Sequence, residues 1–299
     1  MSNCLTLIAD PAGPRLTADH LGAAQDALVR AGARCGVPDW LAPDIACDLP
    51  FAGSSTTEAE RVARTALAGQ KIDLAAQTNS DRRKRVLVAD MDSTIINVEC
   101  IDELADFAGI KARIAAITER AMRGELDFAS ALKERVGLLA GLPEDVIETV
   151  WRDRVRLNPG ARELVQTMRA AGARTFLVSG GFKQFTARVA EAAGFDEDRA
   201  NRLIIEGGRL AGRVAEPILG AEAKLDTLRA SCAALGLGNE AALAVGDGAN
   251  DAAMIEAAGL GVAYRAKSVL KSVANAVIDH GDLTALLYLQ GFRRAEFRR

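Results

Sequence analysis

The sequence predicts an α/β protein: a doubly wound parallel sheet with a helical cap inserted into it, preceded by a smaller α+β domain. Three observations support this class. After residue 85, short apolar runs alternate with helical segments, which is typical of a parallel sheet covered on both faces. The helical stretch after the first of these runs is too long for one crossover and is interpreted as a cap. Residues 1–78 follow a different rhythm, close to βαββαβ, which is ferredoxin-like.

In the first domain we expect a strand at residues 5–9, a helix at 18–31, a strand-like region through 45–49, a helix capped by Thr57 that runs to 67, and a closing strand at 71–75. Residues 77–84 are polar and charged and are interpreted as a linker. The predicted domains are therefore residues 1–78 and 79–299.

In the second domain the expected strands are residues 86–89, 175–178, 242–245 and 261–263, and a Gly207-Gly208 turn predicts a hairpin at 204–210. Helices are expected at 160–170, 182–193, 224–235 and 251–258. The cap is placed at about 98–157, where the sequence is mostly helical.

Composition excludes several classes of protein. The chain has 299 residues, 49% of them apolar, and a net charge of −3, which argues against nucleic acid or a membrane surface as its partner. The basic runs at 82–85 and at 293–294 and 298–299 are interpreted as solvated surface. Five scattered cysteines without CxxC spacing form neither a disulfide framework nor a zinc site. With no signal pattern and no apolar run of about 20 residues, we expect a cytoplasmic protein.

Polar groups of complementary kinds follow three of the predicted strands. Asp90 and Asp92 follow the first, Ser179-Gly180-Gly181 the second, and Gly246-Asp247-Gly248 with Asn250 and Asp251 the third. Lys224 opens the helix before the third strand. Ligands of open α/β sheets bind at the carboxyl ends of strands. A carboxylate nucleophile, a cation site, anion-binding amides and a lysine are what phosphoryl transfer requires.

These residues, in this order over residues 85–265, resemble the four motifs of the haloacid dehalogenase superfamily. The resemblance implies that Asp90 is a nucleophile that becomes an aspartyl phosphate and that Asp92 protonates the leaving alcohol and later activates water. It also implies that Ser179 and Lys224 hold the phosphoryl oxygens. Mg²⁺ would be bound by Asp90, the backbone carbonyl of Asp92, and Asp247, with Asp251 supporting the site.

Asp92 narrows the subfamily, because ion pumps of this superfamily carry threonine there and dehalogenases lack the aspartate. Asp90-Met91-Asp92-Ser93-Thr94 followed by Glu99, Met122, Phe128 and Arg135 resembles phosphoserine phosphatases. The resemblance implies that Glu99 binds the substrate ammonium and Arg135 its carboxylate, while Met122 and Phe128 close over the substrate. Gly180, Gly181 and Asn250 complete the expected substrate site. The expected reaction converts O-phospho-L-serine and water into L-serine and phosphate, the last step of serine biosynthesis.

Two alternatives stay open. The chain could be a phosphatase or phosphotransferase for another small phosphate monoester, or an amino-acid sensor with a vestigial phosphatase domain. The N-terminal domain is compatible with an ACT-like module. Amino-acid binding by that module and assembly into a homodimer stay open together with these alternatives.

Overall fold

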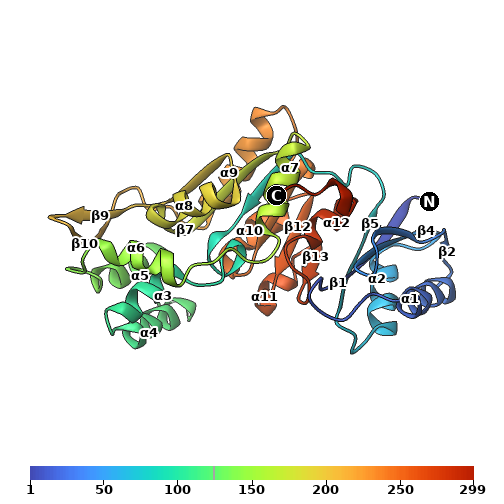
Figure 1. Ribbon diagram of the computed structural model, residues 1–299, viewed down its shortest axis with the longest axis horizontal. Helices are drawn as coiled ribbons and strands as arrows, with labels where there is room; N and C mark the ends of the chain where they lie inside the picture. The colour runs from blue at the N-terminus through green and yellow to red at the C-terminus, as the bar shows by residue number, and fades with distance from the viewer. Residues whose placement is uncertain (124) are drawn as a thin grey trace.

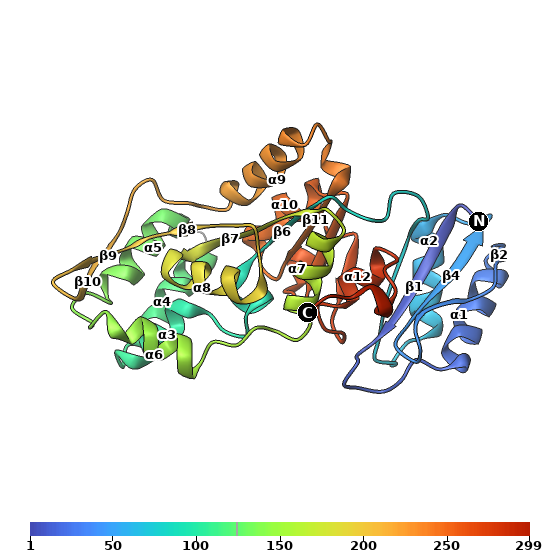
Figure 2. The ribbon, with the colours of Figure 1, turned by 45° about the horizontal axis from the view of Figure 1, so that its top comes forward.

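The computed structural model describes residues 1–123 and 125–299, and the side chain of Met122 lies outside the description. The molecule is elongated (Figures 1 and 2): a small N-terminal sheet with two helices lies at one end, the parallel sheet occupies the centre, and the cap lies at the other end. The predicted fold class is confirmed. No helix in the described ranges is long and apolar enough to span a membrane.

The N-terminal sheet is antiparallel, with strand order β2-β4-β1-β5 and with β3 paired to β4. Its elements are β1 (Asn3–Ala9), α1 (Ala18–Arg30), β2 (Arg34–Cys35), β3 (Asp39–Ala42), β4 (Ala46–Ala52), α2 (Thr56–Ala66) and β5 (Ile72–Thr78). The middle region therefore forms three strands. The predicted cap of α2 was wrong: Ser55, not Thr57, precedes the helix, and its hydroxyl accepts a hydrogen bond from the backbone N–H of Glu58 at 3.2 Å.

Both faces of this sheet are buried. Leu5, Leu7 and Ala9 pack with residues of α1 and α2, as alternation along a strand requires. Ile8, on the opposite face of β1, joins the large apolar cluster of the second domain together with residues such as Leu286 of α12 (Ala285–Leu289). The helix-free face of the N-terminal sheet therefore packs on the second domain.

Two buried polar side chains reinforce this contact. The Asp73 carboxylate of β5 accepts hydrogen bonds from the backbone N–H groups of residues 279–281, the shortest at 2.7 Å. The Arg82 guanidinium pairs with Asp48 of β4 at 2.5 Å and donates to the carbonyl oxygens of Tyr288 and Leu289. The interpretation of Arg82 as solvated surface was therefore wrong, because its partners lie far away in the sequence.

The central sheet is parallel, with strand order β13-β12-β11-β6-β7-β8. Leu87 and Ala89 of β6 face the cluster that contains α7, α8 and α12, whereas Val86 and Val88 face the one that contains α9, α10 and α11. The strands are β6 (Val86–Ala89), β7 (Arg174–Phe182), β8 (Glu197–Asn201), β11 (Ala242–Gly246), β12 (Leu260–Tyr264) and β13 (Ala276–Ile278). The covering helices are α7 (Ala161–Ala170), α8 (Lys183–Ala193), α9 (Glu222–Ala234), α10 (Ala252–Ala257), α11 (Ser268–Lys271) and α12. The sequence did not predict β8, β13, α11 or α12.

The cap consists of α3 (Cys100–Phe107), α4 (Lys111–Met122), α5 (Phe128–Gly137) and α6 (Asp145–Asp153), between β6 and α7. The two segments that join it to the central sheet lie side by side, linked by a bridge between Ile96 and Leu157. The hairpin of β9 (Leu203–Glu206) and β10 (Arg209–Val214) also reaches the cap (Figure 2), where Gly141 donates its N–H to the Leu210 carbonyl at 2.8 Å.

Candidate active site

The polar strand ends predicted from the sequence meet at one edge of the central sheet. Strands β11, β6 and β7 are neighbours, and their carboxyl ends border a cavity of about 610 Å³ between sheet and cap. Ten predicted site residues line this cavity: Asp90, Asp92, Glu99, Phe128, Arg135, Ser179, Gly180, Gly181, Asp247 and Asn250. Lys224 and Asp251 lie behind it and are fully buried. Their functional roles stay predictions.

The turn after β6 brings Asp90 and Asp92 to the same cavity. Asp92 lies beyond the strand, in the turn Met91–Ile95, where Ser93 adopts a positive φ of 55°. The Asp90 carboxylate accepts a hydrogen bond from the Met91 N–H at 2.8 Å. The Asp92 carboxylate accepts one from the Cys100 N–H at 3.1 Å, at the start of the first cap helix. Backbone donors thus orient both carboxylates.

Lys224 connects two of the carboxylates. Its ammonium nitrogen lies 2.7 Å from Oδ1 of Asp90 and 2.5 Å from Oδ1 of Asp251. The other oxygen of Asp251 accepts the N–H groups of Asp247 and Gly248 at 3.2 and 3.1 Å. Asp251 therefore holds the lysine on one side and the turn after β11 on the other.

Burial and mutual repulsion make these carboxyl groups weaker acids than usual. Burial, followed by the charge of Asp251, raises the pKa of Asp90 well above its ordinary value, although Lys224 opposes this. Burial and the charge of Glu99 raise the pKa of Asp92 to about 7. Burial by itself lowers the pKa of Lys224. The charges of Asp90 and Asp251 together have the larger effect, and the pKa of Lys224 is raised. The site is thus crowded with negative charge that one lysine only partly neutralises.

The donor set fits a divalent cation such as Mg²⁺. Asp90, Asp247 and Asp251 each offer a carboxylate oxygen, and these oxygens lie within 4.8 Å of one another. Hard oxygen donors are what Mg²⁺ prefers. Burial, with the charges of Asp251 and Glu99, raises the pKa of Asp247 to about 6, although the charges of Lys267 and Lys224 oppose this.

The carboxyl end of β7, residues 179–181, presents small groups to the cavity. Ser179 is buried, and its hydroxyl oxygen accepts the Gly181 N–H at 2.9 Å. A Cβ on Gly180 would come within 2.9 Å of the Phe128 ring, and one on Gly181 within 2.8 Å of the Asp92 carboxylate. Only glycine leaves room for the cap and the acid at these two positions.

The cap supplies residues that can read a substrate. Glu99 accepts a hydrogen bond from the Ser93 hydroxyl at 2.7 Å. Arg135 donates to the Ala131 carbonyl at 3.2 Å, and burial lowers its pKa while Asp102 and Glu99 counteract this. Phe128 lies over Gly180. The prediction for Met122 concerns a side chain outside the described part of the chain.

The sequence reasoning missed four polar residues that also line the cavity: Ser93, Asp102, Thr118 and Lys267. Ser93 belongs to the first motif and could have been found there. Lys267 donates its backbone N–H to the Asp247 carbonyl at 3.0 Å. The sequence did not indicate that Lys267 lies at the cavity, because its position depends on β12 and on the turn that follows this strand.

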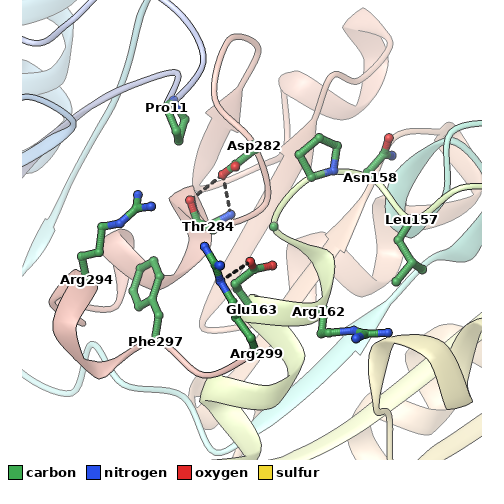
Figure 3. A pocket seen from close by; sticks show the side chains of 12 residues that line it. Pro11, Leu157, Asn158, Arg162, Glu163, Asp282, Thr284, Arg294, Phe297 and Arg299 are labelled. Carbon is green, nitrogen blue, oxygen red and sulfur yellow. Dashed lines mark hydrogen bonds and ion pairs between the residues drawn. The ribbon is translucent and has the colours of Figure 1, made fainter.

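A second cavity, of about 490 Å³, lies where the N-terminal domain meets α7 and the C-terminal residues (Figure 3). Its acidic groups already have partners. Asp282 accepts hydrogen bonds from the backbone and hydroxyl of Thr284, and Glu163 pairs with Arg299 at 3.3 Å. The cavity therefore lies at the junction of three chain segments: the one with Pro11, residues 157–163 and residues 282–299.

Comparison with known proteins agrees with this geometry. The model of the haloacid dehalogenase-like hydrolase family matches residues 87–256. A phosphoserine phosphatase of Albidiferax ferrireducens is 47% identical over 210 residues, which is 69% of this chain and 89% of that protein. A hydrolase of the HAD family from Salmonella enterica serovar Typhi has a similar structure, with a TM-score of 0.82 and 28% identity over 96% of this chain and 98% of that one.

A further solved structure, described as a phospho-aspartyl intermediate analogue of phosphoserine phosphatase, has a TM-score of 0.64 and is 38% identical. The match covers 69% of this chain and 98% of that one.

Proposed function

Since this chain belongs to the haloacid dehalogenase-like hydrolases, we propose that it hydrolyses O-phospho-L-serine to L-serine and phosphate, the last step of serine biosynthesis. The observation that carries the proposal is that Asp90, paired with the buried Lys224, and Asp92 line one cavity that Arg135 and Glu99 also border. The phospho-aspartyl analogue of a relative supports the same chemistry.

In the first step an oxygen of Asp90 attacks phosphorus while the bond from phosphorus to the serine oxygen breaks. Asp92 gives its proton to that departing oxygen, and serine leaves as an alcohol. A pKa near 7 keeps a useful fraction of Asp92 protonated at neutral pH. In the second step Asp92, now a carboxylate, takes a proton from water. The water oxygen attacks phosphorus, and the bond to Asp90 breaks to release phosphate.

The phosphoryl group is held by the donors that face Asp90. Ser179 and Gly181 line the cavity together with Asp90, and the buried Lys224 ammonium contacts the Asp90 carboxylate at 2.7 Å. Mg²⁺ would be held by Asp90 and Asp247, with the backbone carbonyl of Asp92, and Asp251 would support the site. When bound, the cation neutralises phosphoryl oxygens and favours ionised Asp90.

The amino-acid part of the substrate is recognised by the cap. A planar guanidinium binds a carboxylate with two parallel hydrogen bonds, and the half-buried Arg135 lines the cavity. Glu99 supplies the negative charge for the ammonium group. Phe128 lies across Gly180 and excludes water from the phosphoryl site.

The test is release of inorganic phosphate from phosphoserine in Mg²⁺ buffer, compared with phosphothreonine, sugar phosphates and p-nitrophenyl phosphate. We expect kcat/KM to be highest for phosphoserine. Equal or higher values for sugar phosphates would refute the serine assignment. Formation of a new phosphate ester when homoserine is added would indicate a phosphotransferase. Light scattering of the same preparation tests the homodimer.

A further inference from the structure

Asn201, the last residue of β8, is buried beside Gly180 of the phosphoryl site although the mechanism does not use it. Its side chain is 2% exposed. The amide nitrogen donates to the carbonyl oxygens of Gly180 at 2.9 Å and Leu219 at 3.1 Å, and the amide oxygen accepts the Leu219 N–H at 2.8 Å. Both N–H bonds of the amide are thereby used, which is how a buried polar group is retained without penalty.

The bond to Gly180 determines where the next amide points. The peptide bond between Gly180 and Gly181 is trans. Among the described residues, the cis peptide bond is the one between Glu216 and Pro217. In a planar trans peptide the carbonyl oxygen and the following N–H point in opposite directions. With the Gly180 oxygen held by Asn201, the Gly181 N–H must point to the other side, where Ser179 and the cavity lie.

The bonds to Leu219 reach the other anion-binding element. Residue 219 lies three residues before α9, and Lys224 is in the first turn of that helix. Because Asn201 binds both the N–H and the carbonyl of Leu219, it fixes this segment as a paired strand would. One side chain therefore ties the end of β7, which carries Ser179, to the segment that leads to Lys224.

We propose that Asn201 is a positioning residue for the phosphoryl group: it sets the Gly180–Gly181 peptide plane and the start of α9 at a fixed separation. The inference rests on the proposed function. Because glycine has no side chain to pack, without this contact the bond from the Gly181 N–H to the Ser179 hydroxyl is left to hold the peptide plane, which can then rotate more easily. A displacement of the donors weakens binding of the phosphoryl group in ground and transition states alike, independently of the group attached to it.

The decisive variant is Asn201→Asp, which keeps the shape and the acceptor but places a carboxylate oxygen against two carbonyl oxygens. We expect kcat/KM to fall on the order of 10- to 100-fold, equally for phosphoserine and for p-nitrophenyl phosphate. The dissociation constant of inorganic phosphate, measured by calorimetry, should rise about tenfold. Asn201→Ser is uncharged and has one donor, so we expect smaller losses of kcat/KM and of phosphate affinity. This variant replaces Asn201→Asp in the test if the aspartate variant does not fold.

The matched control is Asn275→Asp. Asn275 accepts the Gly261 N–H at 2.7 Å and is not among the residues that line the cavity, so its variant should keep wild-type constants. All assays are run well below the melting temperature of each variant. Wild-type phosphate affinity and kcat/KM in folded Asn201 variants would overturn the proposal, as would a loss confined to phosphoserine.

Failure of the proposed function is separable from this outcome. It would be seen in the wild type as absence of phosphate release from phosphoserine. The affinity for inorganic phosphate and the hydrolysis of p-nitrophenyl phosphate would still report on Asn201.

Discussion

The ammonium nitrogen of Lys224 lies 2.7 Å from the carboxylate of Asp90, and both side chains are almost completely buried. A buried ion pair is favourable only while both partners are present, because a single buried charge loses its hydration without compensation. The predicted nucleophile is therefore held in place by a residue that also counters the charge of Asp251. The chemistry and the stability of this site depend on the same contact.

Lys224→Met should impair both properties. The variant leaves Asp90 and Asp251 without their cation, at a cost of about 3–5 kcal/mol in the free energy of unfolding measured in EDTA. Added Mg²⁺ should raise the melting temperature of the variant more than that of the wild type, because the cation would neutralise the same carboxylates. Lys271→Met, which breaks an exposed pair with Asp279, should cost at most about 1 kcal/mol. Equal effects of Mg²⁺ on variant and wild type would contradict the shared-charge explanation.

Asp90→Asn should abolish turnover. An amide has no charge with which to attack phosphorus, so we expect kcat to fall at least about a thousandfold. Mass spectrometry after acid quench should detect a phosphorylated chain in the wild type and none in the variant. Near wild-type activity in the variant would refute the aspartyl-phosphate mechanism.

Arg135→Ala should discriminate between substrates. Loss of a charge-assisted pair with the substrate carboxylate should reduce kcat/KM for phosphoserine on the order of 10- to 100-fold. The rate with p-nitrophenyl phosphate, which has no carboxylate, should change little. Arg120→Ala is the control, because Arg120 lies on the same cap but pairs with Glu134 at the surface. Similar losses with both substrates would show that Arg135 does not read the carboxylate.

Glu99→Gln should move the alkaline limb of the pH profile. The charge of Glu99 raises the pKa of Asp92, so Asp92 stays protonated to higher pH while that charge is present. Removal of the charge lowers this pKa, and the fall of kcat/KM with rising pH should begin at lower pH. The measurement uses phosphoserine at saturating Mg²⁺, with Glu119→Gln on the exposed cap surface as control. An unchanged limb, or one at higher pH, would count against Asp92 as the acid.

Arg82→Met should destabilise the whole chain, because it leaves Asp48 buried without its partner. We expect a loss of about 3–5 kcal/mol in the free energy of unfolding. The double variant Arg82→Met with Asp48→Leu should be less destabilised than Arg82→Met alone, since no unpaired charge is left. Chemical denaturation of the wild type, of Arg82→Met, of Asp48→Leu and of the double variant gives the coupling energy between the two side chains. Additive effects of the two substitutions would exclude a coupled pair.

The meeting of Asp90, Ser179 and Asp247 could be predicted because their strands are apolar runs and the carboxyl ends of parallel strands share an edge. Strand β8 could not be predicted from the sequence, because it is an edge strand and carries charged residues such as Glu197 and Arg199 instead of an apolar run. Asn201 was missed with it. The burial of Arg82 was missed for another reason: its partners Thr6, Asp48 and Tyr288 are distant in the sequence, and a basic run alone resembles surface.

The placement of the N-terminal sheet has a consequence for how the chain can be divided. The last carbonyl oxygens of α12 are capped by Gln77 and Arg82, and the apolar residues beside them are covered by β1 and β4. A fragment that begins at β6 would expose these uncapped carbonyl oxygens and these apolar side chains to water. We therefore expect a fragment of residues 86–299 to aggregate when it is expressed alone.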